Sequence, residues 1–145
     1  MARYVETIDG RNQAVTKFIN IDANQTIKTG DLIQINGATG KGVVAVAAST
    51  TLIGIAQKDI TTGATVTSKD NIPVTLLKSA VVRIDYTGTT KSSLAETDLY
   101  TVKFDLGSKN TVNLDDTTGG MCQVIAYDNT KKTADVVFTA ASQVL

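Results

Sequence analysis

Three segments of the sequence indicate the fold: Asp31-Leu32-Ile33-Gln34-Ile35, Ile53-Gly54-Ile55-Ala56 and Gly63-Ala64-Thr65-Val66. Each resembles a later segment, and these are Asp98-Leu99-Tyr100-Thr101-Val102, Gln123-Val124-Ile125-Ala126 and Thr133-Ala134-Asp135-Val136. A weak internal repeat of this kind predicts two similar β units, over roughly residues 29–70 and 96–139, with residues 74–86 as a bridge between them. The alternative is coincidence among short strands that are rich in valine and threonine.

Short apolar runs separated by turn residues continue along most of the chain. Valine and threonine suit the half-buried surface of a sheet, and glycine pairs such as Asn36-Gly37 and Gly119-Gly120 suit tight turns. The predicted strands are Asp31–Ile35, Gly42–Ala47, Leu52–Gln57, Ala64–Thr67, Val74–Lys78, Val81–Tyr86, Leu99–Phe104, Thr111–Leu114, Gln123–Tyr127 and Asp135–Thr139. This spacing predicts a mainly β protein, folded as a compact β-sandwich or small barrel.

At most one short helix is expected. Ser93 and Glu96 have the spacing of a capping box, in which two side chains satisfy the free amides of a first helical turn. The pattern predicts a single turn within Ser92–Asp98. The glycine-rich stretch from Gly37 to Gly42 precedes a predicted strand, whereas a phosphate-binding loop opens a helix, so a hairpin turn is the favoured interpretation.

The N-terminal residues differ from the rest of the chain. Residues 1–16 mix charged and polar side chains with little periodicity and are predicted to form an extended arm, with residues 17–145 as a single β domain. Arg3, Tyr4 and Val5 are the predicted partner-binding residues, because arginine and tyrosine are favoured in protein interfaces. A frayed terminus is the alternative.

Charge and hydropathy argue against several partners. The chain has 14 basic and 14 acidic residues, so its formal net charge is zero and it has no net positive charge that would attract a nucleic acid. No apolar stretch approaches the length of a membrane span, and the start of the chain has no apolar signal-peptide core. We therefore expect neither a nucleic-acid nor a membrane partner, and synthesis in the reducing interior of a cell.

The sequence contains few of the residue types that catalysis needs, and we expect that the protein is not an enzyme. Histidine is absent, which removes the commonest general base and the commonest metal ligand. The single cysteine, Cys122, lies in an apolar run and is interpreted as a buried structural thiol. Asp115-Asp116 could coordinate a hard cation, but a solvated turn explains the pair better. No catalytic, cofactor-binding or metal-binding residue is predicted.

Several of these segments, in this order, resemble a family of small tailed-phage capsid proteins. The likeness rests on Thr29-Gly30-Asp31-Leu32-Ile33, on Ile53–Ile60 with Thr62-Gly63 behind it, on the strands within Val74–Val82, on Asp98-Leu99-Tyr100 and Thr111-Val112-Asn113, and on Ala134–Phe138. Members of this family look like head decoration, or cement, proteins, and some carry misleading recombinase labels. They are mainly β, are often trimeric, and bind the outer surface of the major capsid shell.

The resemblance implies a structural virion protein that decorates and stabilises the outer surface of a capsid. It implies the major capsid protein as partner, a homotrimer, and a location on the outside of the virion after synthesis in the host cytoplasm. The alternatives are another virion part, such as a tail component, a head fibre base or an adhesin-like module, and a soluble module that binds carbohydrate or peptide.

Overall fold

The computed structural model describes residues 1–9 and 13–145. These residues form short strands and two 3-10 turns, and they contain no α-helix. The strands are β1 (Arg3–Thr7), β2 (Thr16–Asn20), β3 (Thr26–Ile27), β4 (Leu32–Asn36), β5 (Lys41–Val44), β6 (Leu52–Ala56), β7 (Ile60–Thr61), β8 (Asn71–Leu76), β9 (Ala80–Thr87), β10 (Lys103–Ser108), β11 (Thr111–Asn113), β12 (Cys122–Asp128) and β13 (Thr133–Phe138). The prediction of a mainly β protein is confirmed.

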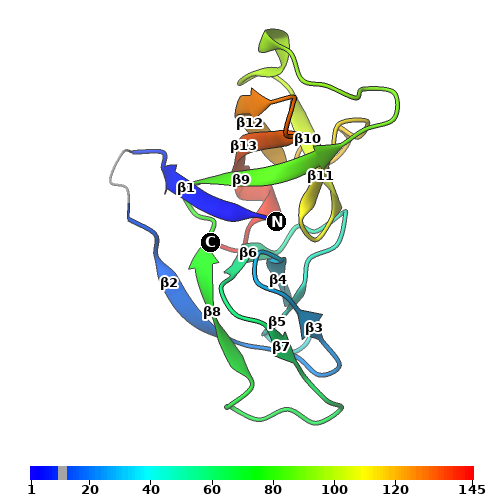
Figure 1. Ribbon diagram of the computed structural model, residues 1–145. Coiled ribbons are helices and arrows are strands. Elements are labelled where there is room, and N and C mark those ends of the chain that lie inside the picture. Colours follow the sequence, from blue (N-terminus) through cyan, green and yellow to red (C-terminus); the bar gives the residue numbers. More distant parts are fainter. Residues whose placement is uncertain (10–12) are drawn as a thin grey trace.

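The C-terminal half of the chain folds into a closed five-stranded barrel (Figure 1). The strands pair in the order β9-β11-β10-β12-β13, and β13 pairs with β9 to complete the ring. Side chains alternate along β13, where Ala134, Val136 and Phe138 are buried while the residues between them are partly exposed. This period of two places one face of each strand in the barrel interior. The expectation of a small barrel is therefore confirmed.

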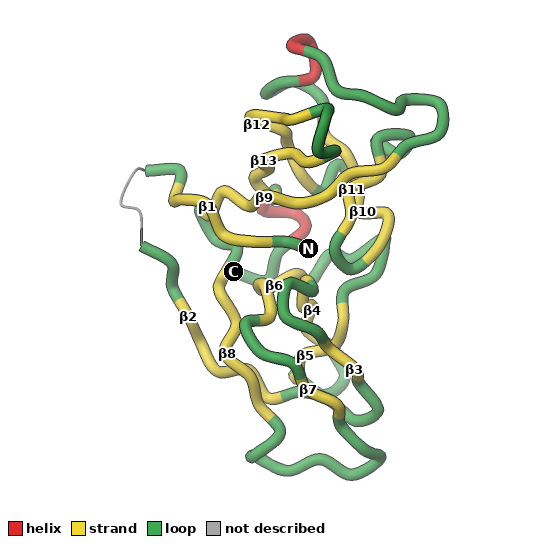
Figure 2. Tube along the Cα trace, in the orientation of Figure 1, coloured by secondary structure: helices red, strands yellow, loops and turns green. Residues whose placement is uncertain are grey.

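The N-terminal half forms a second five-stranded sheet in the order β2-β8-β6-β4-β5, with the two-stranded β3-β7 sheet beside it. Ile21, which directly follows β2, makes an isolated parallel bridge to Gly42 on β5. This bridge brings the two outer strands of the sheet together at one end only. Figures 1 and 2 show this sheet below the barrel, with both chain termini near the junction of the two.

The two halves share one topology. Each unit begins with one strand, β2 or β9, which is followed by an antiparallel hairpin, β4-β5 or β10-β11. The strand after the hairpin, β6 or β12, pairs with the first strand of that hairpin. The last strand, β8 or β13, pairs antiparallel with its predecessor and with the first strand, β2 or β9. Each unit also contains a parallel contact: Ile21 with Gly42 in the first unit, and β9 with β11 in the second. Two similar β units are therefore present.

The units begin and end elsewhere than the sequence pattern suggested. Counted by their strands they span residues 16–76 and 80–138, instead of 29–70 and 96–139. Of the three matched segment pairs, only Ile53–Ala56 and Gln123–Ala126 lie on equivalent strands, β6 and β12. The third pair fails because the counterpart of β13 is β8, and the segment after Gly63 is a loop.

Two of the predicted strands are wrong. Ala64–Thr67 lies in a loop, and most of Leu99–Phe104 precedes β10, which begins at Lys103. The segment before β10 contains the 3-10 turn η1, Glu96–Asp98, instead. The turn is capped by Asp98, whose carboxylate accepts the Ala95 N–H at 2.8 Å, and not by the expected Ser93–Glu96 box. A single turn is thus present within Ser92–Asp98 as predicted, and a second 3-10 turn, η2, spans Ala140–Ser142.

One large apolar core joins both units. Leu32, Leu52 and Ile55 of the first unit belong to the same buried cluster as Phe104 and Val124 of the second. A smaller cluster that includes Ile21, Ile33 and Ile72 fills the far side of the first unit. Each fully buried side chain of this size contributes roughly 1.5–3 kcal/mol. The shared core therefore fixes the two units against each other.

The N-terminal segment 1–16 is extended over Arg3–Thr7, but that stretch is a sheet strand. β1 pairs antiparallel with β9, opposite Ala80–Arg83, and its register shifts between Tyr4 and Glu6. Ala2 is buried in the large core, and its N–H donates to the Gly30 carbonyl at 3.0 Å. Residues 10–12 of the predicted arm lie outside the described residues.

Candidate functional site

The predicted partner-binding residues Arg3, Tyr4 and Val5 occupy three different environments on β1. Arg3 is exposed, Val5 is half-buried, and Tyr4 is a half-buried residue that packs against the large core. The Tyr4 hydroxyl is buried and has no hydrogen-bond partner among the described residues. The structure thus leaves Arg3 as the most accessible of the three, and their role in partner binding stays a prediction.

Arg3 lines a polar hollow of about 160 Å³ beside β9, β12 and β13. Within it Arg83 donates from Nε and from a terminal nitrogen to the two carboxylate oxygens of Asp135, at 2.6 and 2.7 Å. This hydrogen bonding by Asp135, together with its charge, raises the pKa of Arg83. Arg83 is therefore already satisfied, which leaves Arg3 as a cation without an ion-pair partner among the described residues.

A second hollow, of about 400 Å³, lies between residues 48–50, the loop before β12 and η2. Its buried carboxylate, Asp105, accepts the Gly119 and Met121 N–H groups at 2.7 and 3.2 Å. Asp116 accepts the Thr118 N–H at 3.0 Å, which is the main reason that the pKa of Asp116 is lowered. Backbone amides thus engage both carboxylates.

Asp115 and Asp116 do not form a joint site. Asp115 accepts N–H groups from Thr89, Thr90 and Lys91, at 2.5, 3.2 and 2.7 Å, and so holds the loop after β9. Among the described residues there is no group of three or more histidine, cysteine or acidic side chains that could hold a metal ion. The pair is a structural element of two loops.

Two other interpretations of the sequence are confirmed. The glycine-rich stretch is a hairpin, because β4 and β5 pair across it from Ile33 with Val44 to Asn36 with Lys41. Cys122 is a buried free thiol, and burial is the main cause that raises its pKa to about 12. At neutral pH this sulfur is protonated and shielded from reagents, so it serves as a packing residue.

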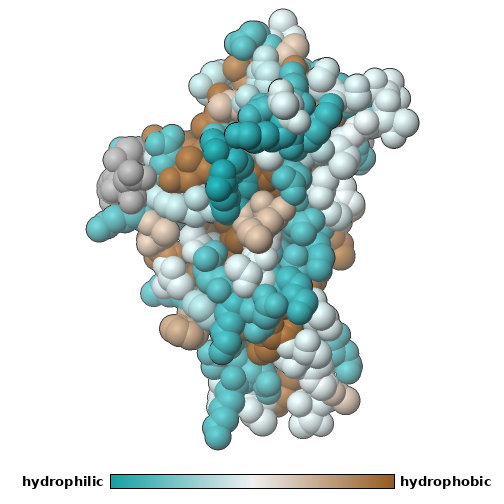
Figure 3. All heavy atoms as spheres, in the orientation of Figure 1, coloured by the Kyte–Doolittle hydropathy of each residue, from teal (hydrophilic) through white to brown (hydrophobic). Residues whose placement is uncertain are grey.

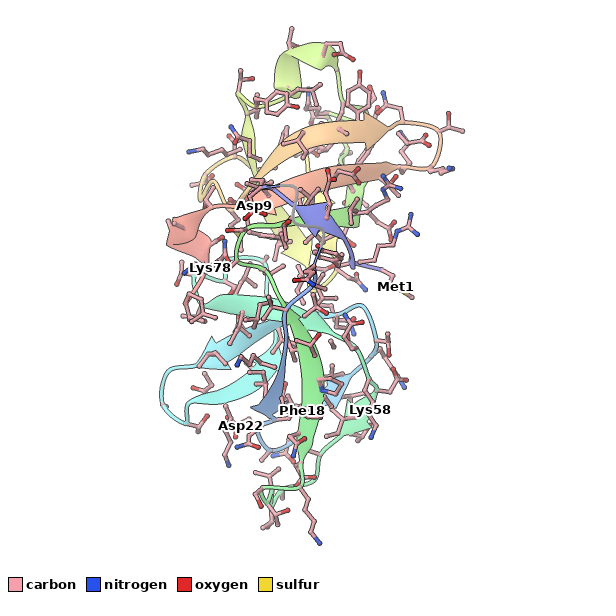
Figure 4. The ribbon with its side chains drawn as sticks, turned by 90° about the vertical axis from the view of Figure 1, so that its left-hand side faces the viewer. Met1, Asp9, Phe18, Asp22, Lys58 and Lys78 are labelled. Atoms are coloured by element: carbon pink, nitrogen blue, oxygen red, sulfur yellow. The ribbon has the colours of Figure 1, made fainter. Side chains whose placement is uncertain are left out.

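Exposed apolar side chains gather along β1 and β2. Ile8 follows β1, Val15 precedes β2, and Phe18 in the middle of β2 is 73% exposed. Figure 3 shows apolar surface beside β1 and again beside β2, within a surface that is otherwise largely polar. Figure 4 shows β1 and β2 one above the other on one side of the molecule, with Phe18 standing out from it. We call this surface, defined by β1, Ile8, Val15 and β2, the β1–β2 face.

A shallow hollow of about 340 Å³ divides this face between the end of β1 and the start of β2. Val15, Leu76 and Lys78 contribute to its lining. Exposed aromatic side chains and shallow apolar hollows are both common in protein–protein interfaces, where aromatic residues fill pockets of the partner. Sequence reasoning missed β2 and Phe18, because the strand is polar apart from Phe18 and Ile19.

None of the helical segments among residues 1–9 and 13–145 is long and apolar enough to span a membrane. No protein-family model matches the chain, and a search of curated proteins yields no significant match. The geometry of the β1–β2 face and the chemistry of the hollows beside Arg83 and Asp105 are therefore the basis for a functional proposal.

Proposed function

We propose that this chain is a structural virion protein that decorates the outer surface of a tailed-phage capsid and stabilises it by binding the major capsid protein. The observation that carries the proposal is strand β2, in which four of five residues are exposed and an aromatic ring stands in solvent. A strand of this kind is costly in a protein that acts alone and useful in one that binds a neighbour. The resemblance of the sequence to cement proteins supports the same role.

The rest of the molecule fits a binding role without chemistry. The two β units share one core, which gives a stiff block for presenting the β1–β2 face. The carboxylates of Asp135 and Asp105 are engaged by Arg83 and by backbone amides respectively, and the thiol is buried. A protein that binds only the assembled shell stabilises that shell by mass action. Catalysis is no part of the proposal.

The proposal includes a homotrimer on the shell. Three copies around a cyclic axis match the local three-fold positions of an icosahedral capsid, so that three identical contacts act together. Sedimentation velocity of the purified chain tests this point directly. A trimer at micromolar concentration agrees with the proposal, and a monomer at all accessible concentrations contradicts this part of it.

The decisive experiment uses particles of the virus that encodes the chain, with and without its gene. We expect the chain to co-purify with filled heads, and heads that lack it to release DNA at a lower temperature. Addition of the purified chain should restore the higher temperature. Density on the tail or on a fibre would favour the alternative of another virion part, and particles that neither contain the chain nor respond to it would overturn the proposal.

A further inference from the structure

Strand β2 has one paired edge and one open edge. Toward β8, the Val15 carbonyl accepts the Leu76 N–H at 2.8 Å, and the Ile21 N–H donates to the Asp70 carbonyl at 2.7 Å. The register between these two bonds is unbroken, from Thr16 opposite Thr75 to Asn20 opposite Asn71. Because bonding groups alternate along an antiparallel strand, the backbones of Lys17 and Ile19 face β8. Those of Thr16 and Phe18 face away from it.

The first part of the open edge has no neighbouring strand within the described part of the chain. On this edge, β2 is bridged just after its C-terminal end, where Ile21 pairs with Gly42 and the Asp22 N–H donates to the Gly42 carbonyl at 2.9 Å. Thr16, Lys17 and Phe18 are all exposed. The edge therefore presents two N–H groups and two carbonyls, from Thr16 and Phe18, to whatever lies beside it.

Lys17 restricts which strand can pair with this edge. It lies between Thr16 and Phe18, and it shares a side of the strand with the partly buried Ile19. In an antiparallel pair formed at Thr16 and Phe18, Lys17 would take the non-hydrogen-bonded position, where opposite side chains approach most closely. A like charge there is destabilising and an acidic residue is stabilising.

The charged residues around β2 also favour an acidic partner strand. Lys17, Lys69 and Lys78 have no ion-pair partner among the described residues, and they lie on β2 and beyond the two ends of β8. The nearby acids Asp22 and Asp70 are engaged by neutral donors, the first by Asn36 and Thr39 and the second by Thr67. Two β2 edges paired with each other would bring lysines together, so a second copy of this edge is a poor occupant.

We propose that the open edge of β2 takes up one extended strand of a different protein, antiparallel to β2, with an acidic side chain opposite Lys17 and an apolar one against Phe18. The inference rests on the proposed function, under which this strand belongs to the major capsid protein. Backbone bonds to Thr16 and Phe18 supply affinity, and the two side-chain contacts supply selectivity. Figure 4 shows Phe18 on β2, beside β8.

The first experiment tests the edge without any virus. The isotope-labelled full chain is mixed with a synthetic Thr-Val-Glu-Val-Thr peptide, and amide exchange is followed by NMR. We expect exchange at Thr16 and Phe18 to slow at least tenfold, while a peptide with lysine in place of glutamate gives no protection. Equal exchange with and without the glutamate peptide would overturn the inference.

The second experiment uses heads that lack the chain and measures its rebinding. Thr16→Pro removes an outward N–H but none of the bonds to β8, and Phe18→Ala removes the exposed ring. Each should weaken head binding at least tenfold, whereas Tyr100→Ala, which trims an exposed aromatic residue on another loop, should leave it unchanged. Thermal melts establish whether each variant is folded. If Thr16→Pro is not folded, Phe18→Ala still tests the inference.

The two experiments separate the inference from the function on which it rests. Normal head binding by both edge variants would overturn the role of β2 and leave the decoration function standing. Peptide protection at Thr16 and Phe18 without any head binding would support the edge and overturn the decoration function. Self-association of the chain that is abolished by Thr16→Pro would show a second copy on the edge, contrary to the inference.

Discussion

Asp31 is a single residue that links the two β units through its side chain. Its carboxylate is 2% exposed, and it accepts the Lys28 N–H at 2.9 Å and the Lys109 ammonium at 2.9 Å. Asn110 adds a longer contact at 3.4 Å. Beside this cluster the Leu32 N–H donates to the Lys109 carbonyl. The contacts cross from the start of β4 to the hairpin between β10 and β11.

Replacing Asp31 with alanine should therefore destabilise the protein substantially. We expect a loss of about 2 kcal/mol in the free energy of unfolding, because a partly buried backbone N–H loses its acceptor while Lys109 can still reach water. Urea denaturation followed by circular dichroism measures the change. Lys131→Ala is the control, since its ion pair with Asp128 is exposed and its loss should cost less than about 0.5 kcal/mol. Equal midpoints for the two variants would contradict the prediction.

At the scale of the element, Asp115 shows how a loop depends on pH. The N–H groups of Lys91 and then Thr89 hold the pKa of the Asp115 carboxyl below its ordinary value of 3.8. A depressed folded-state pKa gives stability that is present above the unfolded pKa and is lost as the pH falls through the folded value. The pKa values of Asp22, Asp59 and Asp128 are shifted in the same direction.

The free energy of unfolding should accordingly be nearly constant from about pH 5 to pH 8 and should fall below about pH 4. The chain has no histidine that could add a transition within that range. Chemical denaturation at a series of pH values checks the profile. Asp115→Asn should make the acid limb shallower, and a titration step between pH 6 and pH 7 would count against the interpretation.

Strand β6 depends on close approach to β8 at Gly54. A Cβ atom at this position would lie 2.3 Å from Val74 Cγ1 and 2.4 Å from the Thr75 carbonyl oxygen. Gly54→Ala must therefore push the two strands apart, and we expect a loss of more than about 2 kcal/mol in thermal denaturation. Gly63→Ala is the matched control, because no atom of the described residues beyond its two chain neighbours lies within 4 Å of the position that its methyl group would take. It should change stability by less than about 0.5 kcal/mol.

At the scale of the whole molecule, the shared core should make the two β units unfold together. Leu32 and Leu52 of the first unit and Phe104 of the second belong to one buried cluster, so opening either unit exposes the large core of both. We expect one calorimetric transition with equal calorimetric and van't Hoff enthalpies. Two resolved transitions, or a stable fragment of residues 80–145 alone, would show that the units are independent.

Several features followed from the amino-acid sequence by itself. Valine, threonine and glycine patterns identified the β class, the hairpin after Asn36 and most strands of both units. The apolar setting of Cys122 indicated a buried thiol. These features are local, because strand propensity, turn chemistry and the burial of a small apolar run depend on neighbouring residues.

Only the tertiary structure decided which strands pair, where each unit begins and which edge stays open. β1 and β2 lie in a segment without periodicity, and they are strands because β9 and β8 supply bonding partners more than 50 residues away. Ala64–Thr67 has the composition of a strand but no partner strand among the described residues, and it is a loop. A strand exists only where another backbone satisfies its amides and carbonyls, and that requirement is met by contacts far apart in the sequence.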